Sequence, residues 1–226
     1  MVETAPHTLS VYDAHLGELI RRVEDMGASA RAQLARLLAA VRHGDGEEFA
    51  AVIAADDRID AQRGDIDREA LELIARLQPV ARDLRVIVAA QRVSRELERI
   101  GDHVKRMAKR LREQHLPLPA EIVGRLLWIG GQAQTLLTQA VEAFVGADAS
   151  ASERAWLDDA ELDRMYHGLI GELLARMREA PEWIETGVSL VTVAKSLERI
   201  GDHATNIAEE ARFVVSGELP PLHRSV

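Results

Sequence analysis

The chain has 226 residues, no cysteine, 37 acidic residues against 28 lysines and arginines, and a formal net charge of -9. The missing cysteines exclude disulfides, thiolate metal sites and cysteine nucleophiles, so any metal must be bound by oxygen or imidazole ligands. The negative charge argues against general binding to nucleic acid, whose phosphates repel an acidic surface. The sequence shows neither a signal peptide nor an apolar stretch long enough for a membrane span. We therefore expect a cytoplasmic protein without direct membrane insertion.

The distribution of helix breakers predicts an all-α protein. All seven prolines lie between stretches rich in Ala, Leu, Glu and Arg, which favour helices, and no stretch alternates as a half-buried strand would. Glycines and small polar clusters supply the remaining breaks. We expect six helices, over residues 7–43, 46–77, 79–114, 119–146, 150–179 and 181–216.

An internal repeat divides the chain into two similar parts. The heptapeptide Leu97–His103 recurs letter for letter as Leu197–His203, and chance identity over seven residues is negligible. Asp56–Asp60 is echoed more weakly by Asp159–Asp163. Two copies of a three-helix unit favour a pseudo-symmetric pair of three-helix bundles over an extended solenoid. The units are expected to span residues 1–116 and 117–217, with a tail over residues 218–226.

Helical geometry places the acidic residues of these motifs in pairs. An apolar seam recurs at steps of four and three along residues 93–111, and again along residues 193–207. Glu98 and Asp102 point away from this seam and are expected to be a surface pair. The same four-residue spacing occurs in each of four pairs. They are Asp56 with Asp60, Glu98 with Asp102, Asp159 with Asp163, and Glu198 with Asp202.

The four pairs have two interpretations. Like charges at this spacing repel by roughly a few tenths of a kcal/mol, and most such pairs are solvated surface. Because the unfavourable spacing occurs four times, a bound cation is the alternative. Arg95, Arg99 and Arg199 could supply part of the positive charge in an ion-pair network. Hard carboxylate oxygens also suit iron, manganese, magnesium or calcium.

Gly101 and Gly201 occupy the same place in both heptapeptides. A glycine inside a helix costs roughly 0.5 to 1 kcal/mol relative to alanine, so we expect close helix approach here, with or without a metal. His103 and His203 are interpreted as packing or capping residues, because the Glu-x-x-His motif of di-metal bundles is missing. The basic residues that begin at Lys105 are interpreted as solvated charge near a helix end.

The two heptapeptides, the stretch Gln78–Arg85 and the two Asp-x-x-x-Asp pairs closely resemble the PhoU family of phosphate-signalling regulators. The resemblance covers nearly the whole chain and implies two three-helix bundles, usually in a homodimer. It also implies metal binding, in some members as multinuclear iron clusters, with manganese, magnesium or zinc as other candidates. The implied ligands are Asp56, Asp60, Glu98, Asp102, Asp159, Asp163, Glu198 and Asp202. The first unit is about three residues longer between its two motifs, so the two metal faces need not be identical.

The function that this resemblance implies is regulatory rather than catalytic. Similar proteins act with the ATPase subunit of the phosphate ABC transporter and with its sensor histidine kinase. They restrain phosphate uptake and phosphate-starvation gene expression when phosphate is plentiful. Two alternatives remain from other classes. One is a metal-dependent helical-bundle enzyme, which needs an open coordination site and a cleft, and the other is a metal-free structural adaptor whose acids pair with arginines.

Overall fold

The computed structural model describes residues 6–113 and 118–218, with side chains from residue 14 onward. Within these ranges the chain forms α-helices and one 3-10 turn, and contains no strand, which confirms the all-α prediction. The elements are α1 (Pro6–His43), α2 (Gly46–Leu77), α3 (Ala81–Arg112), α4 (Ala120–Gly146), α5 (Ala151–Glu179), η1 (Pro181–Trp183) and α6 (Ile184–Ser216). None of the described helices is both long and apolar enough to cross a membrane.

The helix ends follow the breakers in the sequence. Gly44, with a φ of +67°, ends α1, and the Asp45 carboxylate caps α2 by accepting from the backbone N–H groups of Glu47 and Glu48. The third helix begins two residues later than predicted. Gln78 adopts a left-handed conformation before Pro79, and Val80 is extended, so the helix starts at Ala81.

Part of the predicted organisation falls on residues that the structure does not describe. The boundary between residues 116 and 117 lies within residues 114–117, and the predicted tail lies beyond residue 218 except for its first residue. The division at residue 116 therefore stays a prediction.

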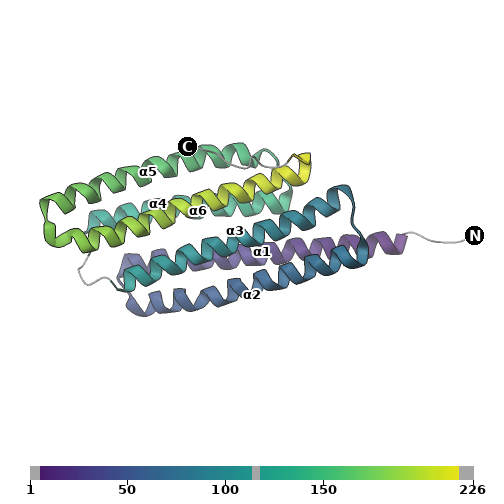
Figure 1. Cartoon of the computed structure of the whole chain (residues 1–226), viewed down its shortest axis with the longest axis horizontal. Coiled ribbons are helices and arrows are strands. Elements are labelled where there is room, and N and C mark those ends of the chain that lie inside the picture. Colours follow the sequence, from purple (N-terminus) through teal and green to yellow (C-terminus); the bar gives the residue numbers. More distant parts are fainter. Residues whose placement is uncertain (1–5, 114–117, 219–226) are drawn as a thin grey trace, which may run out of the picture.

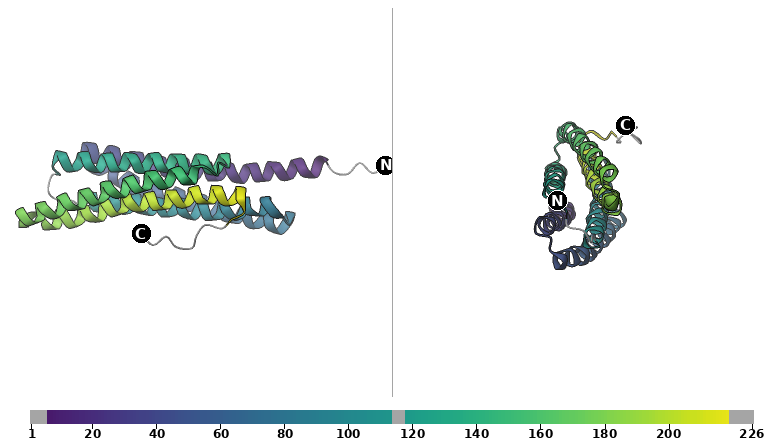
Figure 2. Two further views of the ribbon diagram at one scale, coloured as in Figure 1. Left: turned by 90° about the horizontal axis from the view of Figure 1, so that it is seen from above. Right: turned by 90° about the vertical axis from the view of Figure 1, so that its left-hand side faces the viewer.

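The six helices form two groups of three that lie side by side (Figure 1). The groups meet where α3 packs against α6 and α1 against α4. The helix α2 packs on α1 and α3, and α5 packs on α4 and α6. In the end-on view of Figure 2, α2 and α5 accordingly lie at opposite ends of an elongated cross-section. This arrangement gives each outer helix one neighbour that carries a heptapeptide.

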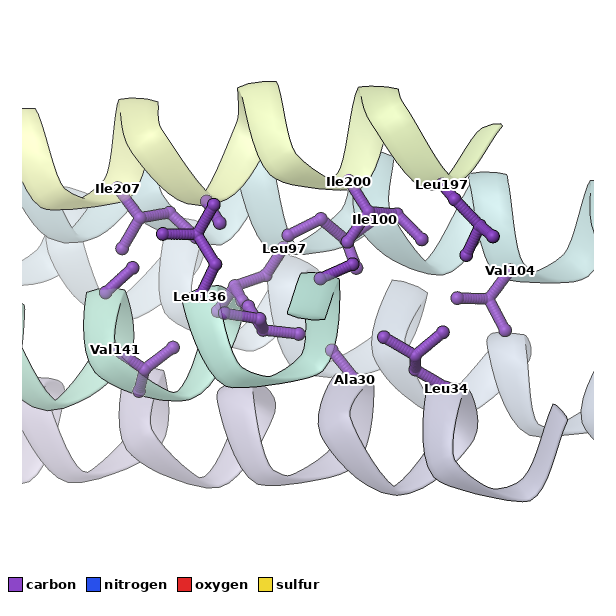
Figure 3. Close-up of a cluster of buried hydrophobic side chains, with 14 of the residues drawn as sticks. Ala30, Leu34, Leu97, Ile100, Val104, Leu136, Val141, Leu197, Ile200 and Ile207 are labelled. Atoms are coloured by element: carbon purple, nitrogen blue, oxygen red, sulfur yellow. The ribbon is translucent and has the colours of Figure 1, made fainter. Parts of the chain in front are cut away.

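The apolar seams of both heptapeptide helices lie in a core that the two groups share. Leu97 and Ile100 of α3, together with Leu197 and Ile200 of α6, are at most 2% exposed. Figure 3 shows these four side chains among residues of α1 and α4. Burying them fixes the rotation of α3 and α6 about their axes, because exposing such side chains costs roughly 1.5–3 kcal/mol each. The glycine of each heptapeptide is thereby turned toward the outer helix of its group.

Candidate functional site

Gly101 and Gly201 are the points where each outer helix closely approaches its neighbour. A Cβ atom at Gly101 would lie 2.9 Å from Oδ1 of Asp56, and one at Gly201 would lie 2.7 Å from Oδ1 of Asp159. Both distances are shorter than a Cβ atom tolerates, which confirms the predicted close approach. The contact brings the acidic pairs of neighbouring helices together. We call Asp56, Asp60, Glu98 and Asp102 the first acidic face, and Asp159, Asp163, Glu198 and Asp202 the second acidic face.

Burial of these carboxylates differs from the sequence prediction. Glu98 was expected to be part of a surface pair, but its side chain is only 15% exposed, and that of Glu198 is only 11% exposed. Asp56 is 1% exposed. The surface prediction is wrong for Glu98 and Glu198, because a helical wheel describes one helix alone, whereas α2 and α5 cover this side of α3 and α6. Asp102 and Asp202 remain about one-third exposed, with side-chain values of 37% and 34%.

Cations compensate most of the charge of the first acidic face. The ammonium group of Lys105 donates to Oδ2 of Asp56 at 2.7 Å, and the Gln33 amide lies 3.4 Å from Oδ1 of the same carboxylate. Arg63 Nη1 lies 3.2 Å from Oε1 of Glu98. The interpretation of Lys105 as solvated charge is therefore wrong. The sequence contained a sign that Lys105 lies at the acidic face. It follows Gly101 by four residues and therefore shares the side of α3 that this glycine turns toward α2.

The second acidic face has fewer cations. Lys195 pairs with Oε1 of Glu198, and Arg199 Nη1 lies 2.8 Å from Oδ2 of Asp202. Asp159 has no ion-pair or hydrogen-bond partner among the residues that the structure describes. Burial and the carboxylates of Asp202, Asp163 and Glu198 raise the pKa of Asp159 to about 7. Burial, followed by Glu198, also raises the pKa of Asp202, against the opposing effect of Arg199.

Both arginines at the heptapeptides form the contacts expected of an ion-pair network. Arg99 Nη1 lies 3.7 Å from Oδ2 of Asp102, and Arg199 occupies the corresponding place on the second acidic face. Arg95, the third predicted cation, instead helps to lower the pKa of Glu96. Burial acts to raise the pKa of Glu96, but the hydrogen bonds from His203 and Asn206, together with the charges of His203 and Arg95, lower it on balance. The predicted ion-pair network is thus confirmed for Arg99 and Arg199. The sequence analysis did not identify Lys105, Arg63 and Lys195 as further cations of these faces.

The two histidines pack against each other at the interface between the two helix groups. The ring centroids of His103 and His203 are 5.5 Å apart, and Nδ1 of His203 lies 2.7 Å from Oε2 of Glu96. Burial, with the neighbouring His203 and arginines, lowers the pKa of His103 to about 4. His103 is therefore neutral at physiological pH. This arrangement agrees with the predicted packing role.

Several buried carboxylate oxygens are unsatisfied, and this is the observation that bears on metal binding. Among the described side chains, Oδ1 of Asp159, Oδ1 of Asp163, Oε2 of Glu198 and Oε2 of Glu98 are buried without a hydrogen-bond partner. Buried polar atoms are normally satisfied, and carboxylate oxygens are the ligands that iron, manganese and magnesium accept. The donor chemistry therefore fits a metal ion. In the described conformation no three acidic or histidine side chains already form a metal-binding group.

Fold and site together define a class of all-helical proteins with two repeats and one partly buried acidic face in each repeat. The sequence model of the PhoU domain family matches residues 23–111 and 126–211. Each match spans one helix group and includes its acidic face. The chain belongs to the PhoU domain family.

Relatives of known identity agree with this assignment. The chain is 39% identical over 214 residues to a phosphate-specific transport system accessory protein PhoU homolog of Caulobacter vibrioides, covering 94% of this chain and 93% of the relative. The crystal structure of PhoU from Pseudomonas aeruginosa is similar with a TM-score of 0.84 and 32% identity, covering 92% of this chain and all of that one. The phosphate transport system regulatory protein PhoU from Streptococcus pneumoniae gives a TM-score of 0.86 at 26% identity, covering 93% of this chain and all of that one.

Proposed function

We propose that this protein is a negative regulator of phosphate uptake and of phosphate-starvation signalling. It acts as a homodimer on the cytoplasmic side of the phosphate ABC transporter, where it contacts the ATPase subunit and the sensor histidine kinase. The observation that carries the proposal is the 39% identity, over nearly the whole length of both chains, to a phosphate-specific transport system accessory protein. Those relatives are named as accessory proteins, which supports a regulatory and not a catalytic role.

Deletion of the gene tests the regulatory role. In medium rich in phosphate, a reporter of phosphate-starvation genes should be silent in the parent strain and active in the deletion strain. Return of the wild-type gene should silence it again. A deletion strain whose reporter stays silent in high phosphate contradicts the proposal. Co-purification with the ATPase subunit and with the kinase, tested separately, examines the two partners.

We further propose that the acidic faces bind metal ions as part of this regulation. The support is the set of unsatisfied oxygens on Glu98, Asp159, Asp163 and Glu198, together with the burial and like-charge repulsion that raise the pKa of Asp159 to about 7. A bound ion would supply positive charge to oxygens that accept no hydrogen bond from the described residues. The carboxylates of both faces would hold it, and Gly101 and Gly201 keep the contributing helices close enough to share it.

Elemental analysis of protein purified without chelators tests this second proposal. We expect iron or manganese in the protein, and uptake of either ion after removal and readdition. A protein that neither carries nor takes up iron, manganese, zinc or magnesium contradicts it. The metal-free adaptor is the alternative that the observed ion pairs of Lys105, Arg63 and Arg199 favour. Full regulation by a chain whose eight face carboxylates are replaced by amides would support that alternative.

A further inference from the structure

We propose that Lys105 serves as a built-in cation of the first acidic face, so that the second acidic face is the one that binds a divalent metal ion tightly. This inference rests on the proposed metal-binding role and adds that the two repeats differ in their affinity for the metal ion. Neither the repeated heptapeptide nor the family assignment predicts it, because both halves match the same domain. The difference in affinity comes from positions that correspond between the two repeats but carry different residues.

On the first acidic face, protein groups already occupy both oxygens of the most buried carboxylate. Asp56 is 1% exposed, its Oδ2 accepts from Lys105 at 2.7 Å, and its Oδ1 accepts from Gln33 at 3.4 Å. The Gln33 amide also donates to the backbone carbonyl of Val52 at 3.1 Å, which fixes its position. A metal ion that used Asp56 would have to displace the ammonium group or bind beside it. Both alternatives weaken binding, because the first breaks a buried ion pair and the second brings cations together.

On the second acidic face, the corresponding positions carry no such partners. Thr205 stands where the first repeat has Lys105, and Leu136 stands at the same sequence offset from Gln33 that relates Asp159 to Asp56. Thr205 is 8% exposed, and its hydroxyl oxygen has no hydrogen-bond partner within the described residues. Neither residue can neutralise a carboxylate. Asp159 therefore lies against Gly201 without the cation that Asp56 has.

Unsatisfied oxygens are concentrated on the second acidic face. Among the side chains described, buried carboxylate oxygens without a hydrogen-bond partner belong to Asp159, Asp163 and Glu198 there, but only to Glu98 on the first face, where the amide oxygen of Gln33 is also unpartnered. Glu198 is the sharpest case, since the residue is only 9% exposed and its Oε2 has no hydrogen-bond partner. Such oxygens lose their water without gaining a hydrogen bond, although Arg199 Nε lies 3.8 Å from Oε2 of Glu198. A metal ion would satisfy them at little cost in displaced protein contacts.

The charge balance points the same way. On the first acidic face three cations, namely Lys105, Arg63 and Arg99, pair with Asp56, Glu98 and Asp102, and Asp60 is in no ion pair within the described residues. On the second acidic face two cations, namely Lys195 and Arg199, pair with Glu198 and Asp202, and Asp159 and Asp163 are in no ion pair in the described part of the chain. Lys195 binds Glu198 and lies 5.3 Å from the ring centre of Tyr166, so it does not replace Lys105 at Asp159. The second face thus retains more uncompensated negative charge.

Exchanging the two differing residues tests the inference. The variants are Lys105→Thr and Thr205→Lys, each of which places in one repeat the residue found in the other. Metal-free protein of each variant and of the wild type is titrated with Mn²⁺ alone, and bound ions are counted by calorimetry and by electron paramagnetic resonance. Circular dichroism confirms that the variants are folded. Asp56→Asn and Asp159→Asn, added singly to each protein, report which face holds an ion.

We expect wild-type protein to bind Mn²⁺ at a site that Asp159→Asn removes and Asp56→Asn does not. Lys105→Thr should gain a further site that Asp56→Asn removes, and Thr205→Lys should weaken the existing site by about 10- to 100-fold. Unchanged binding in both exchange variants, or equal loss with either asparagine substitution in the wild type, overturns the inference alone. Failure of the wild type to take up Mn²⁺ or iron overturns the proposed metal role, and this inference with it.

Discussion

The two acidic faces share a heptapeptide but differ in how their charge is compensated. Both have a glycine that admits an aspartate from the neighbouring helix, at 2.9 and 2.7 Å from the position of a Cβ atom. Asp56 meets Lys105 and Gln33 there, whereas Asp159 meets only other carboxylates in its electrostatic surroundings. The comparison teaches that the repeated motif determines how the helices pack. Residues outside the motif determine what the resulting acidic face can bind.

Because the two faces are compensated differently, the aspartates at corresponding positions, Asp56 and Asp159, affect the stability of the fold differently. An aspartate that is paired in the folded state favours folding, while an unpaired one that is buried among like charges opposes it. Asp56 belongs to the first case and Asp159 to the second. Substitutions at corresponding positions should therefore have unequal effects, and in one case effects of opposite sign.

The largest expected effect follows from removing the cation of the first acidic face. Lys105→Ala leaves Asp56, with its side chain only 2% exposed, without its ionic partner. We expect the free energy of unfolding to fall by about 3 kcal/mol. The matched variant Thr205→Ala removes an unpartnered hydroxyl and should cost less than about 1 kcal/mol. Urea denaturation in the presence of a chelator measures both, and equal losses in the two variants would contradict the comparison.

A second prediction concerns the pH dependence of stability. Because the pKa of Asp159 is raised from 3.8 to about 7, the folded state retains this proton longer than the unfolded state does. The stability that it contributes is fully present below about pH 4 and is lost as the pH rises to about 7. In metal-free protein, Asp159→Asn removes this loss. It should raise the free energy of unfolding by about 1 kcal/mol at about pH 8, after allowance for solvent screening, and change it little near pH 4.

Asp56→Asn is the control for this experiment. It removes the partner of Lys105, so at about pH 8 it should lower the free energy of unfolding by about 1–2 kcal/mol. The same chemical change thus stabilises one repeat and destabilises the other. Two variants that shift stability in the same direction at that pH would show that the faces are electrostatically alike.

The smallest expected difference concerns the two glycines. In Gly101→Ala the new methyl group meets Oδ1 of Asp56 at 2.9 Å and Ile59 at 3.1 Å, and Lys105 and Gln33 hold this aspartate in place. We expect the free energy of unfolding to fall by about 1 kcal/mol. In Gly201→Ala the methyl group meets Oδ1 of Asp159 at 2.7 Å and Leu162 at 3.2 Å. No described residue holds the Asp159 carboxylate by a hydrogen bond, so it can turn away, and we expect a smaller loss than in Gly101→Ala. Thermal unfolding of the metal-free variants checks this order, and the reverse order would count against it.

Much of the fold could be predicted because its signals are local. Gly44 ends α1, the described prolines lie at or just before the starts of helical elements, and the apolar seam that contains Leu97 and Ile100 identifies the buried side of α3. The glycine inside each heptapeptide also predicted the approach of a neighbouring helix. The start of α3 was missed because Val80 is extended after Pro79, so that the helix begins two residues after the breaker.

The candidate site was predicted less completely because its properties depend on pairs of helices. The acidic residues were found from their spacing, but the burial of Asp56 and Glu198 arises only when α2 and α5 cover the adjoining helices. Lys105 was read as solvated charge, since its partner lies 49 residues away in the sequence. Spacing identifies which residues share a helix face. It does not indicate which residues of another helix compensate them.

The position of bound metal tests the central claim most directly. Crystals grown from metal-free protein and soaked in Mn²⁺ should be measured at a wavelength where manganese scatters anomalously. We predict an anomalous peak on the second acidic face, within reach of Asp159 and Glu198, and a much weaker peak or none beside Asp56 and Lys105. Peaks of equal height on both faces, or a peak on the first acidic face alone, would contradict the account.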